Sequence, residues 1–153
     1  MRYYYLDQPL DRAKRYLNRI ESIDQTGFSE EWKEEELSDD FYSFFVWCYH
    51  IKDWLIQRDD VDTTEIEKFI NVNESLSICA DMANGTKHYN LKRKRTEIQP
   101  SLFSLDICQH KPERNEHTYK FYIKTKSKSV LALDVAKECL NNWEYFIQNN
   151  TRI

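Results

Sequence analysis

Apolar residues recur with a helical period along most of the chain. The first such segment spans residues 9–23, where Pro9 suits a first helical turn and Asp7 can cap the helix N-terminus. A second, stronger pattern ends near Gln57, and the acidic stretch Glu30–Asp40 either opens that helix or leads into it. Its apolar positions are Leu37, Phe41, Phe44, Cys48, Ile51 and Leu55.

Two shorter helices are predicted next. Thr64 and Glu67 have the spacing of a capping box, so a third helix is expected to begin there. Asn73 or Ser75 can cap a fourth helix, and Gly85 marks a place where that helix bends or ends.

The period then changes to strict alternation. Residues 103–107 and 119–125 alternate apolar and polar side chains, and the polar stretch Gln109–His117 lies between them. This pattern predicts a β-hairpin with a long loop, inserted at about residues 102–126. Helical periodicity returns from Val135 to Ile147. The chain is therefore expected to be mainly α, a single domain over residues 1–153 with about five helices and a hairpin before the last helix.

Composition removes several function classes. Only 2 glycines and 3 prolines occur among the 153 residues, so neither a phosphate-binding glycine loop nor a dinucleotide fingerprint can be built. The N-terminus lacks the apolar run of a signal peptide, and no apolar run is long enough to span a membrane. A cytoplasmic protein without membrane contact is expected.

The four cysteines lack zinc-finger spacing. Cys48, Cys79 and Cys139 occupy apolar positions of helical patterns, which is typical of reduced core residues, and Cys108 lies in the hairpin. Neither a metal nor another cofactor is predicted.

The charge is unevenly distributed. The net charge is −4, yet residues 87–128 contain 11 Lys and Arg against 4 Asp and Glu, a local charge of +7. An acidic protein can still bind a polyanion through such a segment, although a solvated loop and an exposed hairpin give the same pattern. The basic residues nearest the fourth helix are Lys87, Lys92, Arg93, Lys94 and Arg95.

The fourth helix carries the strongest candidate chemistry. Asp81, Asn84 and His88 fall on one stripe, with Ser77 one turn earlier and an apolar face on the opposite side. Asp and Asn are poor helix formers, and exposed helix faces usually carry Glu, Lys or Arg instead. The stripe therefore indicates a binding or catalytic face.

His50 and Asp53 share a face of the second helix. If the second and fourth helices pack antiparallel, these two residues can face Asp81, Asn84 and His88 across a cleft. Such a cluster is either a site for chemistry or a buried hydrogen-bond network that joins two core helices. A metal site is chemically possible here, but no dense ligand signature supports one.

Three motifs resemble a group of small uncharacterised bacterial and phage-type proteins, which are similar in turn to the HEPN superfamily. The resemblance covers roughly residues 40–150. The motifs are Phe44-x-x-x-Cys48-Tyr49-His50-x-x-Asp53-Trp54, Ile78-Cys79-x-Asp81-x-Ala83-Asn84-Gly85-x-Lys87-His88 and Trp143-x-x-Phe146-Ile147.

The resemblance implies a helical homodimer and, in many HEPN proteins, a metal-independent ribonuclease of toxin or phage-defence systems. His88 would act as general acid/base, Asn84 would position the phosphate, and Asp81, or His50 with Asp53, would orient the imidazole. The cations Lys87 and Lys92–Arg95 would hold the RNA backbone. The arginine of the HEPN motif would fall at positions 81–83, where no basic residue stands.

A second hypothesis differs in class. The chain would be a non-catalytic homodimeric interaction module, in which the Asp/Asn/His face is a structural polar network. The hairpin would then bind a protein partner, because an unpaired hairpin edge can accept another strand.

Overall fold

The computed structural model describes residues 8–26, 33–58, 61–86, 95–96, 99–113 and 115–150. Within these ranges the chain forms five helices and one antiparallel sheet, which confirms the mainly α prediction with a hairpin before the last helix. The elements are α1 (Pro9–Thr26), α2 (Lys33–Arg58), α3 (Thr63–Val72), α4 (Glu74–Gly85), β1 (Ser101–His110), β2 (Asn115–Lys124), β3 (Ser129–Leu131) and α5 (Ala132–Asn150).

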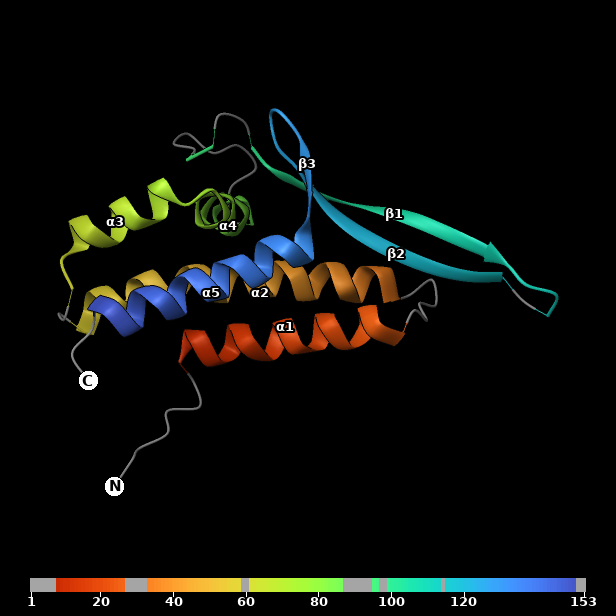
Figure 1. The fold of residues 1–153 in the computed structure, drawn as a ribbon, viewed down its shortest axis with the longest axis horizontal. Coiled ribbons are helices and arrows are strands. Elements are labelled where there is room, and N and C mark those ends of the chain that lie inside the picture. The colour runs from red at the N-terminus through yellow and green to blue at the C-terminus, as the bar shows by residue number, and fades with distance from the viewer. Residues whose placement is uncertain are drawn as a thin grey trace, which may run out of the picture.

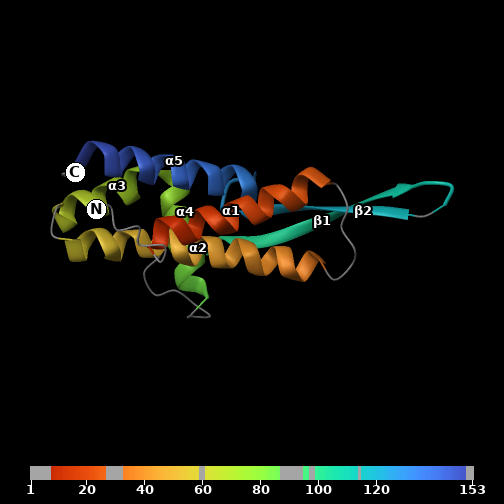
Figure 2. The same ribbon diagram turned by 90° about the horizontal axis from the view of Figure 1, so that it is seen from below.

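Three long helices, α1, α2 and α5, pack side by side and form the body of the molecule (Figures 1 and 2). Their apolar stripes meet in one hydrophobic core, to which all five helices and β2 contribute. None of the helices in the described ranges is both long enough and apolar enough to cross a bilayer.

Helix α4 is the central element of the fold. It is seen end-on in Figure 1 while α2 runs across the view, so α4 crosses α2 steeply. Contacts with α2, α3 and α5 surround α4, and every residue from 75 to 83 is buried. The premise that α2 and α4 run antiparallel is therefore wrong, and both faces of α4 pack against protein.

Helix α3 begins two residues earlier than the capping-box spacing predicts, since that spacing makes Thr64 the N-cap. Asp62 is the N-cap, and its carboxylate accepts the N–H of Thr64 at 3.0 Å. Glu67 does not close a capping box, because its carboxylate pairs with cations from other parts of the chain. At the next junction, Asn73 occupies the N-cap position of α4, although its side-chain amide donates to the Phe69 carbonyl instead.

The hairpin is longer and its loop shorter than the sequence predicts. Strands β1 and β2 pair antiparallel without a break from Ser101↔Lys124 to His110↔Asn115, so only residues 111–114 connect them. The expected long loop Gln109–His117 is therefore wrong, since most of its polar residues belong to the strands. A third strand, β3, which the sequence pattern did not reveal, pairs with the end of β2 and gives the sheet order β1-β2-β3.

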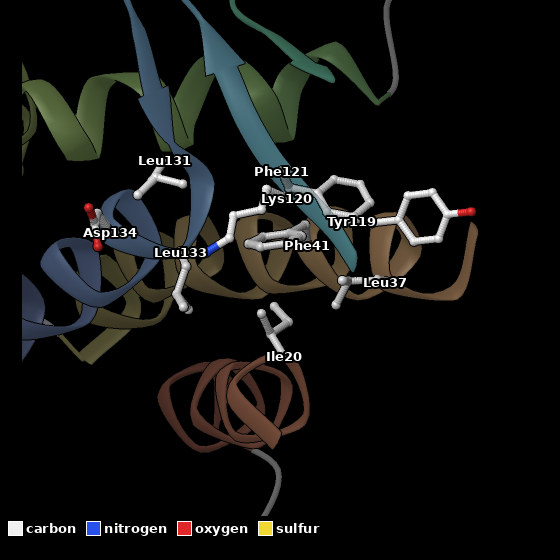
Figure 3. Close-up of a pocket in the computed structure, with 9 residues that line it drawn as sticks. All are labelled: Ile20, Leu37, Phe41, Tyr119, Lys120, Phe121, Leu131, Leu133 and Asp134. Atoms are coloured by element: carbon white, nitrogen blue, oxygen red, sulfur yellow. The ribbon is translucent and has the colours of Figure 1, made fainter. Parts of the chain in front are cut away.

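Among the described residues, the hairpin is anchored to the helices near its base. The ring of Phe121 lies 5.3 Å from that of Phe41 on α2, and Ile123 is fully buried. An apolar hollow of about 170 Å³ remains beside this contact, where Lys120 reaches across from β2 toward Leu133 (Figure 3). Beyond this anchor, the two strands extend past the ends of the helices (Figures 1 and 2).

Candidate functional site

Asp81 is sealed inside the protein and its carboxylate is fully engaged. The residue is 0% exposed. One oxygen accepts the backbone N–H of Arg95 at 3.0 Å, and the other accepts both the backbone N–H of Thr96 at 2.8 Å and the Thr96 hydroxyl. Three donors satisfy the buried charge, so this carboxylate serves as an anchor for residues 95–96.

The same anchor continues at the end of α4. The side-chain amide of Gln99 donates to the Asp81 carbonyl at 3.2 Å. A Cβ at Gly85 would lie 2.6 Å from the Gln99 Nε2 atom, so glycine at this position leaves room for the amide. Helix α4 ends at Gly85, where the sequence allowed a bend or an end, and the Thr86 hydroxyl caps it by donating to the Ala83 carbonyl.

A charged network lies next to Asp81. The guanidinium of Arg95 donates to Glu67 at 2.8 Å and to the side-chain carbonyl of Asn71 at 2.7 Å. Lys52 of α2 binds the other oxygen of Glu67 and lies over the ring of Tyr49. The side chains of Lys52 and Arg95 are only 16% and 18% exposed, so the network joins α2, α3 and residue 95 in a partly desolvated setting.

The pKa shifts in this network follow from its ion pairs. Burial raises the pKa of Glu67, but the hydrogen bonds and charges of Lys52 and Arg95 outweigh burial, and the pKa is lowered overall. Burial likewise lowers the pKa of Lys52, which the bond to Glu67 more than reverses. Glu67 is therefore held as a carboxylate, and Arg95 is committed to structural partners.

The two polar residues predicted on α2 lie apart from Asp81. The ring of His50 packs edge-on against Trp47, with 5.3 Å between ring centroids, and the guanidinium of Arg12 covers the same indole. Asp53 is exposed. The residues of α2 that interact with the Arg95–Glu67 network are Tyr49 and Lys52. Among the described residues, no hydrogen bond joins His50 to Asp81.

The remaining predicted residues divide between two outcomes. Ser77 is buried and donates to the Ile70 carbonyl at 2.8 Å, so it is part of the α3–α4 packing. Asn84 is half-buried near the end of α4. His88, Lys87 and residues 92–94 lie outside the described residues, so the predicted imidazole and most of its cations stay predictions.

Two hollows flank these elements. One, of about 630 Å³, opens beside the end of α3 and the β2–β3 connection and is lined in part by Arg95, Thr96 and Lys126. The other, of about 500 Å³, lies between the first turns of α2 and strand β1 and carries Glu34, Glu35 and Asp39. The first is mixed in charge, whereas the charged residues that line the second are acidic.

The three buried cysteines meet in one place. Cys48 of α2, Cys79 of α4 and Cys139 of α5 have their Sγ atoms within 4.8 Å of one another. All three thiols are free, which agrees with the prediction of reduced core residues. The thiol of Cys79 donates to the Phe45 carbonyl at 3.4 Å and that of Cys139 to the Ser75 carbonyl at 3.2 Å.

Sequence reasoning missed the partners of Asp81 and the meeting of the cysteines. The sequence does not predict the charged network, because its members come from different helices and meet only where those helices pack. These members are Tyr49, Lys52, Glu67 and Asn71. The cysteine spacing of about thirty residues carries no local signature either. The one available signal was the helical period, which places each thiol on the core face of its own helix.

Comparison with protein families, curated proteins and solved structures finds no match to this chain. The likeness to HEPN proteins therefore stays a prediction from the motifs.

Proposed function

We propose that the chain is a non-catalytic interaction module that binds a basic, extended protein segment along strand β1. The observation that carries the proposal is the hairpin, which projects from the helices and exposes residues 105–110 of β1 (Figure 2). The carboxylate of Asp81 also supports the proposal, because it is buried and fully hydrogen-bonded. The interaction-module hypothesis expects the polar face of α4 to be such a structural network.

The exposed part of β1 carries apolar side chains. Phe103, Leu105 and Ile107 alternate along the strand and so share one face. Leu105 is 50% exposed and Ile107 44%. Exposed apolar side chains that line up on one face are typical of a surface that a partner covers.

The backbone of β1 is available as well. Strand β1 lies at the edge of the sheet, and in the described part of the chain it pairs with β2 alone. An exposed edge can accept an extended peptide, whose main-chain hydrogen bonds supply affinity while alternate side chains supply specificity.

The charge beside this edge selects the partner. The hollow between α2 and β1 is lined by Glu34, Glu35 and Asp39 next to Phe103. A segment that alternates Lys or Arg with apolar residues would match both the carboxylates and the apolar face.

Peptide arrays test the proposal directly. Extended peptides that alternate Lys with Val are expected to bind the wild type and to lose binding when Ile107→Lys places a cation on the face. Val72→Lys is the matched control, because Val72 is a 70% exposed apolar residue on α3, away from the hairpin. Equal binding by the wild type and both variants, or none by any of them, would overturn the proposal. Sedimentation of the same variants tests whether the chain itself dimerises through β1.

RNA binding or cleavage is the second candidate. It is favoured by the motif residues Lys87 and His88 in the sequence and by the hollow of about 630 Å³, to which Lys126 contributes a cation. Under this proposal, His88→Ala abolishes RNA cleavage or host toxicity while the protein stays folded, and RNA affinity falls steeply with salt. Unchanged toxicity in a folded His88→Ala variant, or salt-independent binding, would remove it.

A further inference from the structure

The three buried thiols are placed as a set of metal ligands would be. They come from α2, α4 and α5, three helices that surround one point of the core, and they are 0%, 1% and 0% exposed for Cys48, Cys79 and Cys139. An ion bound to three sulfurs in a plane, with bonds of about 2.3 Å, spaces the sulfurs by about 4.0 Å. The observed separations, all within 4.8 Å, leave room for one ion with little movement of the helices.

We propose that Cys48, Cys79 and Cys139 bind a single soft metal ion, and that Cu(I) is the ion the site suits. Thiolate ligands select Cu(I), zinc and iron–sulfur clusters over harder cations. Structural zinc takes four ligands, whereas this group offers three sulfurs in a sealed core. Cu(I) is satisfied by three thiolates and requires no bound water.

A buried indole supports this assignment over a purely apolar role for the thiols. Trp143 is 1% exposed, and among the described residues its Nε1 atom has no hydrogen-bond acceptor. Trp143 stands one turn after Cys139 on α5. An unpaired donor beside a metal-bound sulfur would gain the acceptor it lacks.

Binding of Cu(I) displaces the three thiol protons. Each thiol releases its proton to solvent as its sulfur binds, so one Cu⁺ replaces three protons and one positive charge meets three thiolates. The carbonyls of Phe45 and Ser75, which accept two of the S–H groups, lose these bonds on metal binding. The Cu–S bonds must outweigh the loss of these two hydrogen bonds. Because binding releases protons, Cu(I) binds more tightly as pH rises.

The test uses the Cys108→Ser protein, since Cys108 is the exposed thiol and its removal leaves the cluster intact. Reduced protein is titrated with Cu(I) without oxygen, against a chromophoric Cu(I) chelator. We expect one Cu(I) per chain, with copper X-ray absorption showing three sulfur neighbours and no nitrogen or oxygen. Failure to retain copper against the chelator, copper bound to nitrogen or fewer sulfurs, or a preference for zinc would each overturn the assignment.

Variants then assign the ligands. The Cys139→Ala variant is expected to lose the copper. The Trp143→Phe variant keeps an aromatic ring but lacks the N–H, and it is expected to bind Cu(I) about 10-fold more weakly because the N–H no longer positions the sulfur. Full retention of copper by a folded Cys139→Ala protein contradicts the proposal. If that variant does not fold, the sulfur count in the Cys108→Ser protein decides the question by itself.

Discussion

The carboxylate of Asp81 accepts both the backbone N–H and the hydroxyl of Thr96, a residue 15 positions further along the chain. Together with the bond from the Arg95 N–H, these hydrogen bonds hold residues 95–96 against the buried helix. Because burial without partners would leave a charge in the core, Asp81 and residues 95–96 must become ordered together. This link places Arg95 where its guanidinium can reach Glu67 and Asn71.

Replacing Asp81 with alanine is expected to destabilise the protein strongly. The substitution leaves the N–H groups of Arg95 and Thr96 without acceptors, and it removes hydrogen bonds to a charged group. We expect the free energy of unfolding to fall by about 2–4 kcal/mol, measured by urea denaturation. Asp53→Ala is the matched control, since Asp53 is exposed on α2, and a change within about 0.5 kcal/mol is expected there. Similar small effects at both positions would show that the Asp81 anchor does not hold the fold.

The ion pairs of Glu67 predict a loss of stability in acid. The pKa of Glu67 is lowered in the folded protein, below the usual value of 4.5, because Lys52 and Arg95 bind its carboxylate. The unfolded chain therefore takes up this proton first as pH falls. The stability that Glu67 contributes is complete above about pH 4.5 and is lost as pH drops through the folded pKa.

Thermal unfolding between about pH 3 and 6 measures this effect. The melting temperature of the wild type is expected to fall as pH is lowered from about 6 to 3. The Glu67→Gln variant is expected to have a lower melting temperature than the wild type at pH 6 and a smaller change of melting temperature with pH. Glu113→Gln, an exposed residue in the β1–β2 connection with the same change of charge, should follow the wild type. Parallel curves for wild type and Glu67→Gln would contradict the ion-pair account.

Periodicity alone was enough to predict the helices and the hairpin, because each rests on a local pattern of apolar positions. The six apolar positions predicted between Leu37 and Leu55 recur at helical spacing, and all six are buried in the core, as predicted. The predicted loop was too long because residues 109–117 are polar on both faces and so show no strand pattern. The part of a hairpin that projects from the protein can form without an apolar face. Cross-strand pairing, such as Cys108↔His117, decides its length instead.

The candidate site was less predictable, since it depends on how the helices cross. The stripe of Ser77, Asp81 and Asn84 has the helical spacing expected, but α4 is buried from residue 75 to residue 83, so Ser77 and Asp81 belong to a packing surface. Whether neighbours enclose both faces of a helix depends on tertiary packing, which the pattern of residues along the chain does not specify.

The base and the projecting part of the hairpin should respond differently to mutation. Phe121 is buried against Phe41, so Phe121→Ala is expected to lower the free energy of unfolding by about 3–5 kcal/mol. Leu105→Lys changes an exposed side chain and is expected to alter stability by less than about 0.5 kcal/mol. Urea denaturation of both variants measures this difference. A large loss in Leu105→Lys would mean that the outer face of β1 is already covered within the protein.

The cysteines should react with thiol reagents in two classes. Cys108 is exposed on β1 and is expected to react at once with a disulfide reagent in native buffer. Cys48, Cys79 and Cys139 surround one point of the core, so reaching any of them requires α2, α4 and α5 to separate. These three are expected to react together, at a rate that rises with urea in parallel with global unfolding. Mass spectrometry of partly labelled protein distinguishes this result from stepwise opening: chains with one or four labels should dominate, and abundant chains with two or three labels would show that the helices open one at a time.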